Sequence, residues 1–142
     1  MNAEFLDPLD LRVVDDSGER PTYEVLANCT FYSAQQGREF TIPRGMKTDG
    51  PSIPVIGAAL VGGGQLGLRA GVLHDAMWRD PAITTQVCNA VFYEALTLAC
   101  RVDQAAAANM KIAVDIYATF GGRDAAPPEP PIAGNPEPWS NA

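Results

Sequence analysis

The sequence predicts an α+β fold, with a small antiparallel sheet on the N-terminal side followed by about three packed helices and an extended Pro-rich tail. Three observations support this prediction. Strand-like segments precede helix-like segments without alternating with them. The 142 residues suit one domain with one core. Six of the 12 prolines lie in the last segment, Pro127 to Ala142. We therefore expect a single domain over residues 1–126 and an extended arm over residues 127–142.

Three strands are expected first, because their segments are rich in β-branched and aromatic residues between turn signals. They cover residues 9–14, 23–32 and 39–42. The turn Asp15-Asp16-Ser17-Gly18 closes the first, and Gln35-Gln36-Gly37 separates the other two. The link from Gly45 to Gly67 is crowded with glycine and proline, which predicts a long loop.

Apolar residues at helical spacing predict three helices in the second half of the chain. The first covers residues 66–78 and ends at Asp80-Pro81. The second, capped by Thr84 or Thr85, reaches about residue 101. The third can begin at Asp103 and is stopped by Gly121-Gly122.

The charge balance argues against nucleic acid as a partner. Ten basic against 17 acidic residues give a formal net charge of −7, whereas phosphate binding needs a basic face. No apolar run approaches the roughly 20 residues of a membrane span. The acidic N-terminus lacks the apolar core of a signal peptide, so synthesis in a cytosol is expected. The three cysteines have no C-x-x-C spacing and are interpreted as structural thiols.

The Pro-rich tail has two open interpretations. It can be a disordered tail, or it can be a docking arm that lies along another subunit with Ile132 and Trp139 as its anchors. Gly62, Gly64 and Gly67 spell G-x-G-x-x-G, but a second helix follows where a dinucleotide fold needs a strand. No cofactor is therefore expected.

The single histidine, His74, precedes Asp75 on the first predicted helix. One imidazole excludes metal sites that need several histidines. A Ser-His-Asp arrangement with Ser52 lacks the G-x-S-x-G elbow. A carboxylate site built from Asp49, Asp75 and His74 could hold a divalent ion. The alternative is a hydrogen-bonded structural pair, which is the commoner role of a helical His beside an Asp.

Three segments of the chain follow recognisable sequence patterns. Residues 40–54, FTIPRGMKTDGPSIP, resemble F-x-V-P-x-G-F-x-T-D-G-A-S-I-P. Residues 70–79 resemble A-A-x-x-H-D-x-L-Y-R, and residues 89–96 resemble D-x-x-F-x-x-A-L. In this order the patterns are similar to those of a phage and prophage family catalogued as domain of unknown function 1353. The chain departs from these patterns at Pro51 and at Asn89, where the family pattern has an acid.

The resemblance implies a phage gene product and assigns no reaction. We expect a structural component of a tailed-phage virion, in its tail, neck or tail-tip region, that contacts other virion proteins or further copies of itself. Asp49, Ser52, His74, Asp75 and Asn89 would then brace the long loop against the first helix. One alternative is a small hydrolase of cell wall or peptide, with His74 as base and Asp75 or Asp49 as orienter or metal ligand. Another is an assembly accessory absent from the virion.

Overall fold

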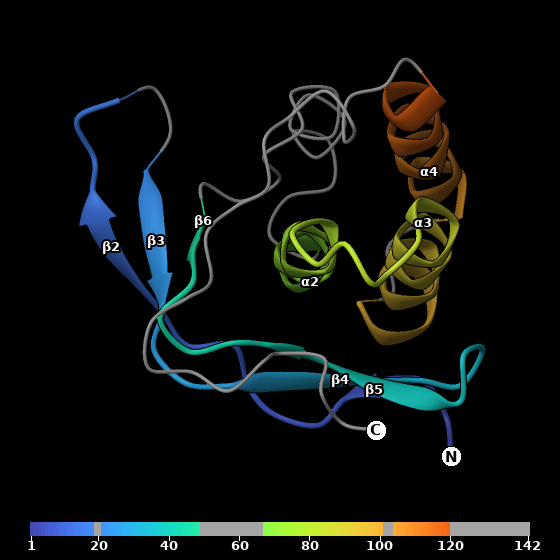
Figure 1. The fold of residues 1–142 in the computed structure, drawn as a ribbon, viewed down its shortest axis with the longest axis horizontal. Coiled ribbons are helices and arrows are strands. Elements are labelled where there is room, and N and C mark those ends of the chain that lie inside the picture. Colours follow the sequence, from blue (N-terminus) through green and yellow to red (C-terminus); the bar gives the residue numbers. More distant parts are fainter. Residues whose placement is uncertain (19–20, 49–66, 101–103, 120–142) are drawn as a thin grey trace.

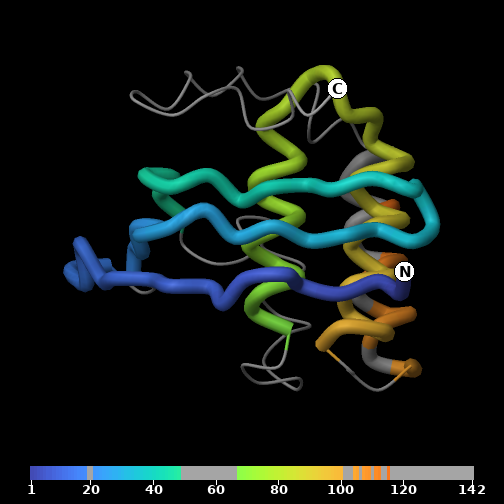
Figure 2. The backbone as a smooth tube through the Cα atoms, turned by 90° about the horizontal axis from the view of Figure 1, so that it is seen from below, coloured from blue at the N-terminus to red at the C-terminus, as the bar shows by residue number. Residues whose placement is uncertain are grey.

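A computed structural model describes residues 1–18, 21–48, 67–100 and 104–119. These residues form short strands in the N-terminal half and helices in the C-terminal half, which confirms the α+β class. Figure 1 shows the helices stacked over one face of the sheet that contains β4 and β5. Seen from below, the strands of that sheet run across the helices (Figure 2).

The strands form two antiparallel sheets of three strands each, with the orders β1-β4-β5 and β2-β3-β6. Their bounds are β1 Glu4–Phe5, β2 Leu11–Asp15, β3 Thr22–Val25, β4 Cys29–Ser33, β5 Arg38–Ile42 and β6 Lys47–Thr48. The turn predicted at Gln35-Gln36-Gly37 joins β4 to β5, and Gly37 adopts a left-handed φ of 65° there.

The prediction of one continuous strand over residues 23–32 is wrong. The segment divides into β3 and β4, which belong to different sheets. Strict alternation would bury residues 25, 27 and 29, but Ala27 is exposed between the fully buried Val25 and Cys29. The chain changes sheets at this break, where the Leu26 amide donates to the Asp10 carbonyl over 2.9 Å.

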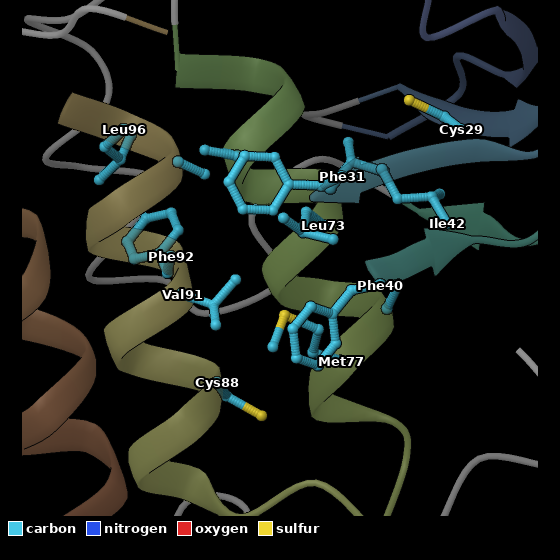
Figure 3. Packing of buried hydrophobic residues seen from close by; sticks show 14 of the residues in the cluster. Cys29, Phe31, Phe40, Ile42, Leu73, Met77, Cys88, Val91, Phe92 and Leu96 are labelled. Atoms are coloured by element: carbon cyan, nitrogen blue, oxygen red, sulfur yellow. The ribbon is translucent and has the colours of Figure 1, made fainter. Parts of the chain in front are cut away.

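The first sheet has one face directed to the helices. In β4 the buried positions alternate, so that Cys29, Phe31 and Ser33 point inward. Phe31 lies opposite Phe40 of β5 in the register. Figure 3 shows these phenylalanines among side chains from the helices, with Leu73 close by. This regular alternation is the pattern of a sheet covered on one side.

The helices are α2 Leu68–Trp78, α3 Thr85–Glu94 and α4 Gln104–Thr119, and a π-helical turn, η2 Ala95–Ala99, continues α3. Thr84 caps α3 as predicted, because its hydroxyl accepts from the Val87 amide at 3.2 Å. The residues from Ala70 to Met77 are all buried. The reason is that α2 packs on β5 and on α3, so it has little surface left for solvent. No helix in the described ranges is long and apolar enough to cross a membrane.

Several expected features fall outside the described residues. They are the part of the long link over residues 49–66, with Gly62 and Gly64, the cap at Asp103, the stop at Gly121-Gly122, and the arm with its boundary at residues 126 and 127. These remain predictions.

The three cysteines are buried free thiols, in agreement with the expected structural role. Burial raises the pKa of Cys29 to about 11 and also raises the pKa of Cys100. Since the thiolate is the reactive form, iodoacetamide at about pH 8 should label Cys29 at least about 100-fold more slowly in the folded protein than in denaturant, and Cys100 should also be labelled more slowly. Residue-specific mass spectrometry measures both rates, and rapid labelling of Cys29 in the folded protein would contradict the expectation.

Candidate functional site

His74 lies in the middle of α2, at the contact with α3, and only 2% of its surface is exposed. Its imidazole is packed against two aromatic rings. The ring centroid of Phe92 is 4.9 Å away and that of Trp78 is 5.1 Å away. A polar ring in such a place needs a hydrogen-bond partner, because burying an unpaired polar group costs about 1–3 kcal/mol.

Asn89 of α3 provides that partner. Its Oδ1 lies 2.9 Å from His74 Nε2, and its Nδ2 donates to Asp115 Oδ1 of α4 over 2.8 Å. Lys111 closes the chain of contacts, with its Nζ 2.7 Å from the other oxygen of Asp115. These four residues, named the helix relay below, connect all three described α-helices through polar side chains.

The orientation of the relay fixes where the imidazole proton sits. An ionised carboxylate only accepts hydrogen bonds, so the amide NH₂ of Asn89 must face Asp115. The carbonyl oxygen of Asn89 then faces His74, and Nε2 of that ring must carry a hydrogen to donate to it. The relay therefore holds His74 with its Nε2 protonated, inside the protein.

Asp75, the neighbour of His74, is tied to a different part of the fold. Its Oδ2 lies 3.1 Å from Arg79, one turn later on α2. The same guanidinium donates to the backbone carbonyl of Lys47 in β6 over 2.7 Å. The carboxylate is 4% exposed and the Arg79 side chain 22%, so the pair is partly shielded from water. The contact links α2 to the second sheet, whereas the helix relay links α2 to α3 and α4.

A third polar contact joins the first sheet to the helices. Glu94, the last residue of α3, accepts from the Ser33 hydroxyl at 2.5 Å and from the backbone amide of Gln35 at 2.9 Å. The Ser33 hydroxyl in turn accepts from the backbone amide of Gln36 at 3.0 Å. Glu94 thus holds the β4–β5 turn, and the π-helical turn η2 begins at the next residue. We name Glu94, Ser33 and Gln35 the turn clamp.

Three of the five predicted brace residues are described. The structure brings His74 and Asn89 together and ties Asp75 to Arg79. Asp49 and Ser52 lie outside the described residues, as do the predicted tail anchors Ile132 and Trp139. The brace between the long loop and α2, and a catalytic or metal role for Asp49 with Asp75, therefore remain predictions. Within the described ranges no three His, Cys, Asp or Glu side chains are grouped as metal ligands.

Sequence reasoning missed Glu94, Ser33, Arg79 and the pair Lys111 and Asp115. Local spacing could have indicated two of the contacts, because Asp75 and Arg79, like Lys111 and Asp115, are four residues apart on a helix. The other two join residues 26 and 61 positions apart, from Asn89 to Asp115 and from Ser33 to Glu94. Nothing in the local pattern signals such pairs.

The substitution Asn89→Asp is expected to make stability depend on pH. It would place a second carboxylate at the position from which the Asn89 amide donates to Asp115 over 2.8 Å. Two carboxylates this close share one proton. The other titratable groups that face these two carboxylates include His74, which contacts residue 89, and Lys111, which contacts Asp115. A protonated imidazole would be attracted to the new carboxylate, which gives the folded variant a further way to bind a proton. The folded variant then binds more protons than the unfolded chain, so its free energy of unfolding falls as pH rises.

Urea unfolding of this variant and of the parent chain measures the effect. The free energy of unfolding of Asn89→Asp is expected to lie below that of the parent, and this deficit should grow by about 2 kcal/mol between about pH 5 and pH 8. Asn89→Ala is the matched control, because it breaks the same hydrogen bonds without adding a titrating group, and its deficit should vary much less. A deficit of the Asp variant that is constant over this range would show that residue 89 and Asp115 are not close in solution.

The comparison with known protein families identifies one match. Residues 23–114 match the family described as "Protein of unknown function (DUF1353)". Neither the curated proteins nor the solved structures provide a match. The matched region begins in β3 and ends inside α4, so it includes His74, Asp75, Asn89 and the turn clamp. Since this region makes up well over half of the chain, the protein belongs to the DUF1353 family.

Proposed function

We propose that the protein is a structural component of a tailed-phage virion, in the tail, neck or tail-tip region, and that it acts through contacts with other subunits. The observation that supports this function best is the use of the motif residues inside the fold. His74 and Asn89 belong to segments that resemble the family patterns, and both are buried in the helix relay. Their side chains hold helices together, as expected of a protein that must keep its shape in an assembly.

The position of the polar contacts between elements supports the same proposal. The helix relay links α2, α3 and α4, the Arg79 contact links α2 to β6, and the turn clamp links α3 to the β4–β5 turn. The hydrogen bonds that join these elements link residues between 15 and 61 positions apart in the sequence. Buried polar groups with satisfied partners make one arrangement of elements more favourable than the alternatives. A body of this kind suits presentation of loops and edges to neighbouring subunits.

Quantitative mass spectrometry of purified virions tests the proposal directly. Particles of the phage or prophage that encodes the chain should contain it at a fixed copy number through successive density gradients. Its absence from particles, while it is present in the producing cells, would contradict the proposal and favour the assembly accessory. The comparison of particle and cell fractions controls for poor expression.

A turnover assay on peptidoglycan and on peptides separates the hydrolase from the virion component. The variant His74→Gln suits this assay, because glutamine can keep an N–H donor toward Asn89 but cannot act as a base. Hydrolysis by the parent chain that His74→Gln abolishes, with the fold intact, would identify an enzyme. The proposed structural role predicts no turnover that depends on His74.

A further inference from the structure

We propose that the outer edge of β2 binds an extended, basic segment of a different protein by strand addition. In the described part of the chain β2 pairs with β3 alone, as the outer strand of the order β2-β3-β6. An outer strand directs every second N–H and C=O away from its neighbour. Such groups are the attachment points for an added strand. This inference concerns one surface and would hold for a partner inside or outside a virion.

Exposure of apolar residues on β2 is the first argument. Four of its five residues are exposed, and Val13 and Val14 keep 51% and 40% of their surfaces accessible. Leu26, next to the end of β3, is also exposed at 43%. In Figure 1, β2 and β3 rise at the end of the first sheet remote from α3 and α4. These apolar side chains therefore contribute little to the core, and an added strand could cover them.

The register of β2 is the second argument. Val13 pairs with Tyr23 and Asp15 pairs with Thr22, so Val14 is an extra residue that has no counterpart on β3. Such a bulge re-aims a side chain and increases the local twist. It also makes the edge a poor template for indiscriminate pairing. A partner must match the bulge, which favours a particular segment over general aggregation.

The charged residues at the ends of β2 indicate which kind of partner the edge would bind. Asp10, Asp15 and Asp16 are exposed at the two ends of β2. The Ser17 hydroxyl and amide both donate to the Asp15 carboxylate and lower its pKa, so it stays ionised at neutral pH. The one arginine of the strand, Arg12, already pairs with Glu24 over 2.8 Å. The edge is therefore acidic, and it complements lysine and arginine side chains.

The same charge argues against a second copy as the occupant. Residues 10–24 hold two arginines and five acids, which gives 2 − 5 = −3 for the hairpin, and the whole chain carries −7. Two such edges brought together would repel each other. A basic segment of another protein gains attraction from the same groups.

A synthetic peptide of alternating lysine and valine is the probe, with binding measured by calorimetry and located by amide chemical-shift changes. The expected shifts concentrate in β2, and the affinity falls with salt. Asp16→Lys should weaken binding at least about tenfold, and Glu4→Lys, the same charge change on a strand of the other sheet, by less than about twofold. Val13→Pro should also weaken binding at least about tenfold, because Asp10 faces β3 through its bond from the Leu26 amide and alternation then directs the N–H of Val13 away from β3.

Other outcomes would overturn the inference. Equal weakening by Asp16→Lys and Glu4→Lys would show attraction to the overall charge only. Shifts located away from β2 would place the binding elsewhere. Self-association in analytical ultracentrifugation that Val13→Pro abolishes would make a second copy the occupant. Circular dichroism of each variant establishes that it folds. Since the peptide assay uses no particles, its result is independent of whether the protein is found in virions.

Discussion

Replacement of His74 by alanine is expected to lower the free energy of unfolding by about 4 kcal/mol, a larger loss than we expect from substitution of any other residue of the helix relay. Two losses add up. The buried imidazole packs against Phe92 and Trp78, with centroid distances of 4.9 and 5.1 Å, so its removal leaves a cavity. The Oδ1 atom of Asn89 also loses its donor inside the protein. Urea unfolding followed by tryptophan fluorescence measures the change.

His74→Gln is the matched control for the hydrogen bond. Its amide can reach toward Asn89 and donate as Nε2–H of the imidazole does, so its cost should be about half that of the alanine variant. If both variants lose the same stability, the bond to Asn89 contributes little and the aromatic packing dominates. A loss below about 1 kcal/mol in His74→Ala would contradict the buried position of the ring.

In a virion, the same loss should appear as reduced incorporation. A subunit destabilised by about 4 kcal/mol has a much larger unfolded fraction available to proteases, so fewer copies reach the particle. His74→Gln should be incorporated at an intermediate level. We expect stability and copy number to fall in the same order, from the parent chain through His74→Gln to His74→Ala. Normal copy number in His74→Ala, together with loss of an enzymatic activity, would contradict the proposed structural role.

Much of the fold was accessible from the sequence, because it rests on local patterns. Helix periodicity and the cap at Thr84 located α3, and the turn signal at Gln35-Gln36-Gly37 located the β4–β5 hairpin. The partition of strands between two sheets was not accessible. Val25 and Cys29 are both buried and are separated by only three residues, but their partners come from different parts of the chain. Composition and spacing do not encode which distant strand a segment pairs with.

The candidate site was also only partly predictable from the sequence. The sole histidine and its neighbour Asp75 could be singled out from the sequence, and Asn89 could be added from the family resemblance. Their actual partners could not. Asp115 comes from a helix 26 residues beyond Asn89, and Arg79 reaches a backbone carbonyl in β6. Such contacts depend on how helices and sheets stack, which a local motif does not specify.

Glu94→Ala is expected to lower the free energy of unfolding by about 3 kcal/mol, although nothing in the sequence pattern marked this residue. The glutamate is 6% exposed and receives the Ser33 hydroxyl and the Gln35 amide. Removing it leaves a fully buried hydroxyl without its acceptor. The gain from no longer burying a carboxylate offsets part of this cost. The β4–β5 turn would also lose its attachment to the end of α3.

A double-mutant cycle with Ser33→Ala isolates the contact. Each single variant should be destabilised, and the double variant by less than their sum, with a coupling of about 1.5 kcal/mol. Glu94→Gln serves as a shape-matched control that keeps the side-chain length and loses the charge. Amide hydrogen exchange should show faster opening of the turn at residues 34–37 in Glu94→Ala than in Glu94→Gln. Additive losses in the cycle would mean that Ser33 and Glu94 do not interact in the folded protein, and the turn clamp would have to be abandoned.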